Sequence, residues 1–217
     1  MIDLTLLDRN KTNAIVIRHA DRDSMQQWQI EQPLNDEGIK HAQELGEKLR
    51  GFENYAFFSS SVDRCHETVT FMQKGIFGKE EKTNTFSEIL GRPGVFVVDR
   101  ENNAFKTLSC RKVVTAQIAH EKLEGIRDTV EGARIFIDFV LEKMHSAHGG
   151  TLLVFVTHDA IIAPVIFELT GEIFGHDSPT ENWPEFTDGF IIEKNNIADS
   201  DEYKVIRKNQ VFELRKF

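Results

Sequence analysis

The sequence predicts a three-layer α/β/α sandwich in which a mostly parallel central sheet carries helices on both faces. Three continuous apolar runs, at residues 13–17, 55–58 and 152–156, have the composition of strands that are buried on both faces. A segment with helical periodicity comes after each run, and strands that alternate with helices are typical of parallel sheets with crossover connections. We therefore expect one domain over residues 1–217, with a small cap or lid inserted around residues 75–125.

The composition is that of an ordinary soluble globular protein, with 40% hydrophobic and 28% charged residues in a chain of 217. Cys65 and Cys110 are too few for a disulfide framework, so we expect free thiols and a cytoplasmic location. The first 13 residues carry acids and lack a signal-peptide core, and no run is long enough to span a membrane. Neither a removed leader nor the oligomeric state can be inferred from these features.

The net charge of −9 argues against a nucleic-acid partner. A nucleic-acid binder normally has a basic stripe, whereas the Lys and Arg residues of this sequence are scattered along the chain. An acidic protein that binds an anion must concentrate positive charge in a pocket. Arg18, Arg22 and Arg64 are the candidates for that charge.

The first helix is predicted to begin after Asn35, which suits an N-cap position. Acidic residues in its first turn favour the helix dipole. Apolar residues then recur at helical spacing along one stripe: Ile39, Ala42, Leu45, Gly46 and Leu49. The polar residues 24–32 before this helix are predicted to form a loop.

The second strand is followed by three serines, residues 59–61, which are suited to cap a helix at residues 62–73. Glycines beginning with Gly75 then interrupt the pattern over residues 75–110. We interpret that stretch as an excursion over the edge of the sheet.

The helical pattern returns from about Lys112 and is clearest at residues 130–144. A further helix is predicted at residues 159–169. Two short apolar runs near the C-terminus, at 190–192 and 203–206, fit an antiparallel edge on a parallel sheet.

Residues 18–22 (RHADR) follow the first strand, and ligands of open α/β sheets bind at the carboxyl ends of strands. Arginine matches phosphate oxygens with two parallel donors, so Arg18 and Arg22 suit a phosphate clamp. A neutral His19 beside such a clamp can attack phosphorus and form a phosphohistidine. Alternatively, the two arginines are surface partners of the neighbouring aspartates.

The other two strands deliver similar chemistry to the same edge. Arg64, in the first turn of the second helix, would point back to an anion site at that helix start, unless it is merely exposed. After the third strand, His158 can stabilise charge on a phosphoryl oxygen. Asp159 can protonate the leaving oxygen, or it is only an N-cap. Because three strands end in residues that suit phosphate, we expect a phosphate-handling enzyme.

These motifs resemble the histidine phosphatase superfamily, which has a phosphoglycerate mutase-like fold and includes acid phosphatases. Residues 18–20 (RHA) stand where the superfamily has Arg-His-Gly, and residues 59–68 resemble its segment with a further phosphate-binding arginine. Residues 33–38 (PLNDEG) resemble its first helix. The RHxxR motif and the His-Asp pair look closer to the histidine acid phosphatase branch.

The resemblance implies a role for each residue. His19 is the nucleophile that becomes phosphorylated, Asp159 protonates the leaving group, and water hydrolyses the phosphohistidine. The phosphoryl oxygens are held by Arg18, Arg22, Arg64 and His158. The resemblance implies no metal ion and no organic cofactor.

Three positions qualify the resemblance. Ala20 replaces the usual glycine, which matters if the backbone there needs a positive φ or a close approach to the ligand. Asp23 stands where the acid-phosphatase motif has proline. In the mutase branch the acid is a glutamate after the second helix, and Glu88 lies in about that place as the alternative to Asp159, which we prefer.

The leading hypothesis is a phosphomonoesterase that acts on a small phosphorylated metabolite. A protein phosphohistidine phosphatase is an alternative, because a small cap leaves an open site. A catalytically impaired member that only binds a phosphate ligand is another. A mutase is disfavoured, since no extra basic cluster is visible. Trp183 is predicted to be half-buried loop packing, with a place at a pocket mouth as the alternative, and His41 is predicted to be an ordinary surface or core histidine. The substrate would be chosen by the irregular segments at residues 22–34, 75–110 and 175–188.

Overall fold

The computed structural model describes residues 1–23, 32–81, 83–91, 94–175, 182–197 and 200–214. The loop predicted for residues 24–32 therefore lies almost entirely outside the described residues.

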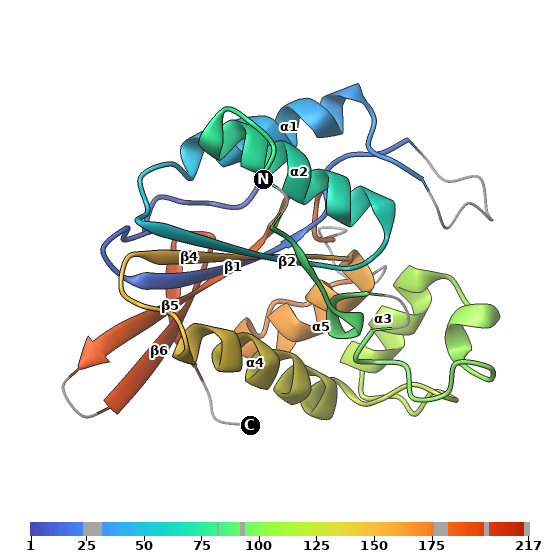
Figure 1. The fold of residues 1–217 in the computed structure, drawn as a ribbon. Coiled ribbons are helices and arrows are strands. Elements are labelled where there is room, and N and C mark those ends of the chain that lie inside the picture. The colour runs from blue at the N-terminus through green and yellow to red at the C-terminus, as the bar shows by residue number, and fades with distance from the viewer. Residues whose placement is uncertain (24–31, 82, 92–93, 176–181, 198–199, 215–217) are drawn as a thin grey trace.

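In the described part of the chain, seven strands form one sheet in the middle of the molecule (Figure 1), in the order β3-β2-β4-β1-β5-β6-β7. The strands are β1 (Thr12–Arg18), β2 (Asn54–Ser59), β3 (Thr85–Phe86), β4 (Thr151–Thr157), β5 (Gly189–Ile197), β6 (Ser200–Arg207) and β7 (Gln210–Glu213). The first four are parallel, and β5, β6 and β7 add antiparallel pairs at the β1 side. A parallel centre with an antiparallel edge is the predicted arrangement.

The strand register brings the polar strand ends together. Arg18 of β1 pairs with Thr157 of β4, and Ser59 of β2 pairs with Val156 of β4. Three strands therefore stop at the same edge, and the residues that follow them share that edge.

Helices cover both faces of the sheet. They are α1 (Asp36–Lys48), α2 (Asp63–Phe77), α3 (Cys110–Ile118), α4 (Thr129–His145) and α5 (Asp159–Thr170). Figure 1 shows α1 and α2 on one face and α4 and α5 on the other, with α3 beside α5. The three-layer prediction is confirmed.

Two hydrophobic cores explain why the central strands are apolar throughout. Ile15 and Ile17 of β1 pack with residues of α1 and α2, whereas Ala14 and Val16 pack with residues of α4 and α5. Successive side chains of a strand point to opposite faces, so a strand covered on both sides has no polar face.

The first helix begins as predicted: the side chain of Asn35 accepts a hydrogen bond from the Gly38 amide, 2.8 Å away. The prediction that Gly75 interrupts the helical pattern is wrong. Gly75 lies inside α2, and a Cβ there would meet the Gln43 carbonyl of α1 at 2.1 Å. The glycine permits close contact between two helices, and α2 ends instead at Gly78, whose φ is 73°.

The excursion over the sheet edge is mostly irregular. Between α2 and α4 it contains the short strand β3, two 3-10 turns at Glu88–Leu90 and Ala104–Lys106, and α3. It extends the layer that contains α5, on the side of the sheet away from α1 and α2 (Figure 1).

Candidate active site

Three side chains predicted to handle phosphate meet at the common strand edge. The Nε of Arg64 lies 3.0 Å from Nε2 of His19, and its Nη2 lies 3.2 Å from Nδ1 of His158. The two imidazole rings are 5.5 Å apart between centroids. All three side chains are buried, with His19 only 2% exposed. The fold therefore gathers residues from the ends of β1 and β4 and from the first turn of α2.

The hydrogen bonds of His19 define which ring nitrogen is available for reaction. Its Nδ1 lies 2.8 Å from the Ala20 carbonyl oxygen, which can only accept, so Nδ1 carries the proton. Its Nε2 then has a lone pair, to which the Arg64 Nε–H donates. Burial and the charges of Arg18 and Arg64 hold the pKa of His19 well below its usual value. His19 is therefore a neutral imidazole at neutral pH.

His158 is held in a matching way. Its Nδ1 accepts from Arg64, and its Nε2 lies 3.1 Å from the hydroxyl of Ser60. The prediction that the serines cap α2 is wrong, because the N-cap is Val62 and no side chain makes a cap bond there. Ser60 instead accepts from the Val62 amide and orients the imidazole.

The guanidinium of Arg18 already has two partners within the protein. Its Nη2 lies 3.1 Å from Oδ2 of Asp159, and its Nη1 donates to the Pro184 carbonyl at 2.7 Å. Asp159 is the first residue of α5, and the N-cap is His158, so the N-cap alternative for Asp159 is wrong. Burial raises the pKa of Asp159, but the charge of Arg18 and a hydrogen bond from Trp183 lower it more. The net pKa lies well below the usual range, and the carboxyl group is ionised.

The structure does not place the other two candidates in the same way. Arg22 Nη1 donates to the Asp23 carbonyl at 3.0 Å and to the Gln32 side chain at 3.2 Å. The side chain of Glu88 is 86% exposed and pairs with Arg100 at 2.8 Å. Between the two predicted acids, Asp159 is the one in contact with the buried cluster.

The substitution of alanine for glycine at position 20 causes no backbone strain. Ala20 is absent from the left-handed region of φ, and its methyl group is buried in the core under α1 and α2. Its amide donates to Thr68 Oγ1 at 2.9 Å, and its carbonyl holds His19. The backbone thus performs its orienting role with an alanine.

Beside Arg18 lies a recess of about 640 Å³, and part of its lining comes from the segment 175–188 that was expected to choose the substrate. Its lining residues are Met1, Arg18, Asp21, His41, Arg111, Trp183, Pro184, Glu185, Phe186 and Thr187. The ring of Phe186 lies 4.1 Å from Cζ of Arg18 and 5.6 Å from the His19 ring, between centroids.

Two residues that were predicted to be unremarkable belong to this recess. Trp183 donates from Nε1 to Asp159 at 3.2 Å, so it is not simple loop packing. His41 Nδ1 lies 2.8 Å from Oδ2 of Asp21. A tryptophan and a phenylalanine close together in an otherwise polar stretch were the available signal for this wall.

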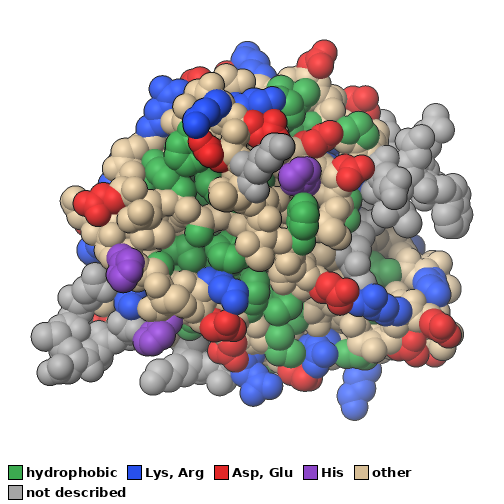
Figure 2. Space-filling view, in the orientation of Figure 1, with side chains coloured by type: hydrophobic (Ala, Val, Ile, Leu, Met, Phe, Trp, Pro, Cys, Tyr) green, Lys and Arg blue, Asp and Glu red, His purple; other side chains and the backbone are tan. Residues whose placement is uncertain are grey.

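Three further observations concern the molecule outside this site. No helix of the described chain is long and apolar enough to cross a membrane. Within the same residues, no group of three or more His, Cys, Asp and Glu side chains is placed to hold a metal ion. On the face shown in Figure 2, Lys and Arg side chains are interspersed with Asp and Glu.

Comparison with known proteins identifies the relatives of this fold. The sequence model of the histidine phosphatase superfamily (branch 1) matches residues 14–176. No curated protein matches the chain at a significant level. The closer resemblance to the acid phosphatases that the motifs suggested is not confirmed, since the match is to branch 1.

Several solved structures share the fold. YhfR of Bacillus stearothermophilus is 16% identical, with a TM-score of 0.57 over 92% of this chain and 97% of that one. A mycobacterial glucosyl-3-phosphoglycerate phosphatase is 15% identical, with a TM-score of 0.55 over 91% of this chain and 98% of that one. Phosphoglycerate mutase of Bacillus anthracis is 18% identical, with a TM-score of 0.51 over 96% and 94%. At these identities the likeness establishes the fold.

Proposed function

This chain belongs to branch 1 of the histidine phosphatase superfamily, and we propose that it hydrolyses phosphomonoesters through a phosphohistidine formed on His19. Membership alone gives an activity of the phosphatase or mutase kind. The observation that carries the finer proposal is the neutral His19, whose Nε2 lone pair lies 3.0 Å from a buried guanidinium. A phosphoryl group that binds this guanidinium is placed beside a nucleophile that needs no deprotonation.

The proposed reaction has two displacements at phosphorus. The Nε2 lone pair of His19 forms the N–P bond while the bond from phosphorus to the ester oxygen breaks, and Asp159 gives its proton to that oxygen. Water then attacks phosphorus and the N–P bond breaks. The proton lost by this water returns to Asp159, and inorganic phosphate leaves. Arg18, Arg64 and His158 donate to the phosphoryl oxygens and stabilise their charge in both steps.

Asp159 must acquire a proton before it can act as the acid, because in the substrate-free protein it is paired with Arg18. A phosphoryl group that binds Arg18 takes these donors from the carboxylate and adds negative charge next to it. Both changes raise the pKa of Asp159. Substrate binding therefore supplies the protonated acid. Glu88 stays the alternative acid, although its side chain is exposed and paired with Arg100.

The test is phosphate release from p-nitrophenyl phosphate by the wild type, His19→Ala and His66→Ala. We expect His19→Ala to lose at least about 10³-fold in kcat, since the nucleophile is absent. The exposed His66 of α2 is the matched control and should keep wild-type turnover. Rapid acid-free quenching with labelled substrate should trap phosphate on the wild type and on His66→Ala, but not on His19→Ala. Wild-type turnover in His19→Ala would contradict the proposal.

Substrate preference, phosphate binding and trapping of the phosphoenzyme separate the remaining alternatives. A protein phosphohistidine phosphatase would prefer a phosphohistidine protein to any small ester. The burial of His19 beneath Phe186, with a recess of about 640 Å³ alongside, favours a small substrate. An impaired ligand-binding member would bind inorganic phosphate and form no phosphoenzyme. A phosphoenzyme that passes its phosphate to an acceptor other than water would identify a mutase.

A further inference from the structure

Residues 182–188, here called the wall segment, connect the site to the rest of the molecule. The amide of Arg18 donates to the Asp188 carbonyl at 2.9 Å. Trp183, at the other end of the segment, donates to Asp159 at 3.2 Å. The wall segment thus touches both the proposed phosphate-binding arginine and the proposed acid, and its position fixes their relative placement.

One backbone hydrogen bond inside the wall segment, from the Asp188 amide to the Glu185 carbonyl at 3.2 Å, is too little to fix its shape. It belongs to no helix or strand. Thr187, which is buried, has a φ of 55°, a left-handed conformation that a β-branched residue rarely adopts. Such a backbone persists only when its surroundings impose it. Those surroundings include the end of β1, because the Thr187 amide donates to the carbonyls of Arg18 and His19 at 3.2 and 3.4 Å. They also include a buried side chain that contacts the neighbouring Asp188.

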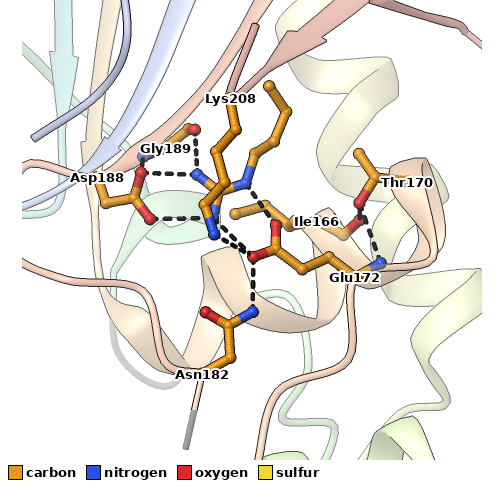
Figure 3. A network of polar contacts seen from close by, with 8 residues as sticks. Ile166, Thr170, Glu172, Asn182, Asp188, Gly189 and Lys208 are labelled. Carbon is orange, nitrogen blue, oxygen red and sulfur yellow. Dashed lines mark hydrogen bonds and ion pairs between the residues drawn. The ribbon is translucent and has the colours of Figure 1, made fainter. Parts of the chain in front are cut away.

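Arg207 of β6 is that side chain, and Figure 3 shows its partners Asp188, Gly189 and Glu172 close together. Its guanidinium donates to both carboxylate oxygens of Asp188, at 2.6 and 2.9 Å, and to the Gly189 carbonyl at 2.7 Å. It also donates to both oxygens of Glu172, at 2.7 and 3.3 Å. Glu172 in turn accepts from the Asn182 amide group at 2.7 Å. One guanidinium therefore fixes both ends of the wall segment: Asp188 directly, and Asn182 through Glu172.

The chemistry of this contact is specific to arginine. The planar fork of the guanidinium binds two carboxylates at once, whereas a lysine ammonium is a point charge that cannot impose both orientations. The Arg207 side chain is only 3% exposed. Buried ion pairs of this kind contribute little net stability, because desolvation offsets their attraction, but they define geometry.

We propose that Arg207, with Glu172 and Asp188, is a positioning clamp that holds the wall segment against Arg18 and Asp159 and so controls substrate binding and proton donation. Arg207 is placed to act through the wall segment and not on the substrate. The proposal rests on the proposed phosphatase activity, but its main readout does not require turnover.

The experiment uses the full chain with Trp28→Phe, which leaves Trp183 as the sole tryptophan of the two in the sequence. In this background we compare Arg207→Met and Arg207→Lys with the parent. In both variants the Trp183 emission should shift to longer wavelength while the far-ultraviolet circular dichroism is retained. With p-nitrophenyl phosphate, kcat/KM should fall roughly 10–100-fold in Arg207→Met. KM should rise, and the pH profile of kcat should shift, because Asp159 loses the hydrogen bond from Trp183.

The matched control is Lys204→Met, which removes a different ion pair of β6, the one with Glu193 of β5. Lys204 lies 2.9 Å from the buried Glu193, which keeps Lys11 as a second partner. This variant should keep the parent's emission and kinetics. If Arg207→Met does not fold, Asn182→Ala serves in its place, since it cuts only the link from Glu172 to the wall segment, and it should shift the emission as well.

Two results would overturn the clamp: parental emission and pH profile in a folded Arg207→Met or in Asn182→Ala, or an equal loss in Lys204→Met. An inactive parent whose emission still depends on Arg207 would instead count against the phosphatase and support the clamp.

Discussion

In the proposed reaction, Arg18 and Arg64 start from different states. Arg64 contacts the imidazoles of His19 and His158, whereas Arg18 is ion-paired with Asp159 and hydrogen-bonded to a carbonyl of the wall segment. A phosphoryl group must therefore replace the Asp159 carboxylate at Arg18. The cost of breaking this pair is offset by the new contacts between Arg18 and the phosphoryl oxygens. Because loss of the pair also raises the pKa of Asp159, binding and acid activation are one event in this proposal.

The identity of the acid can be tested with two substrates of different leaving group. Loss of the acid should slow an alkyl phosphate by about 10²–10⁴-fold, because an alkoxide leaves poorly without a proton. p-Nitrophenolate leaves readily without one, so its ester should be affected much less. We expect this contrast in Asp159→Asn, measured as kcat for glycerol phosphate and p-nitrophenyl phosphate.

Glu88→Gln is the control, and it should match the wild type with both esters. The reverse pattern, with Glu88→Gln slow on the alkyl ester and Asp159→Asn normal, would assign the acid to Glu88.

Sequence reasoning found the residues that directly follow buried strands or begin helices. His19, Arg64, His158 and Asp159 could be located because strand ends in a parallel sheet share one edge. It missed Trp183 and Arg207, which reach the site from an irregular segment and from the antiparallel edge. Their positions depend on tertiary contacts, the Arg207 clamp among them, that leave no local pattern.

At the scale of elements, the site depends on how closely α1 and α2 pack. A Cβ at Gly46 would meet the Met72 carbonyl of α2 at 2.1 Å, and Gly75 has the reciprocal relation to Gln43. The first turn of α2 carries Arg64, so this crossing sets its depth at the strand edge. Periodicity predicted both helices, but it could not show that their glycines make a close contact, because glycine in a sequence more often marks a turn.

The contact between α1 and α2 can be tested by whether Gly46→Ala raises or lowers the free energy of unfolding. In an exposed helix, replacing glycine with alanine is stabilising. Gly46→Ala should instead lower the free energy of unfolding by about 1–3 kcal/mol, because two backbones must separate. Urea denaturation at neutral pH measures it. Glu47→Ala, at the exposed neighbouring position, should change the free energy by less than about 0.5 kcal/mol. A more stable Gly46→Ala would show that α1 and α2 do not pack this closely.

At the scale of the whole molecule, the candidate active site and the Arg207 clamp each contain a titratable group that the fold holds in one charge state. His19 is held neutral, and the Arg207 clamp holds Glu172 ionised. Burial raises the pKa of Glu172, but hydrogen bonds from Arg207, Lys208 and Asn182 lower it more, to about 2. Both groups have a folded-state pKa below the unfolded one, so in each case the unfolded chain binds protons first as the pH falls.

Stability should therefore be lost in two pH windows on the acidic side. The His19 contribution is lost as the pH falls below its ordinary value of 6.5. The Glu172 contribution is complete above 4.5 and is lost as the pH falls toward its folded value of about 2. Urea unfolding at pH 7.5, 5.5, 4.5 and 3 measures both windows. His19→Ala should flatten the curve between pH 7.5 and 4.5, and Glu172→Gln should flatten it only below pH 4.5. A Glu172→Gln curve parallel to that of the wild type below pH 4.5 would mean that the clamp does not hold Glu172 ionised in the folded protein.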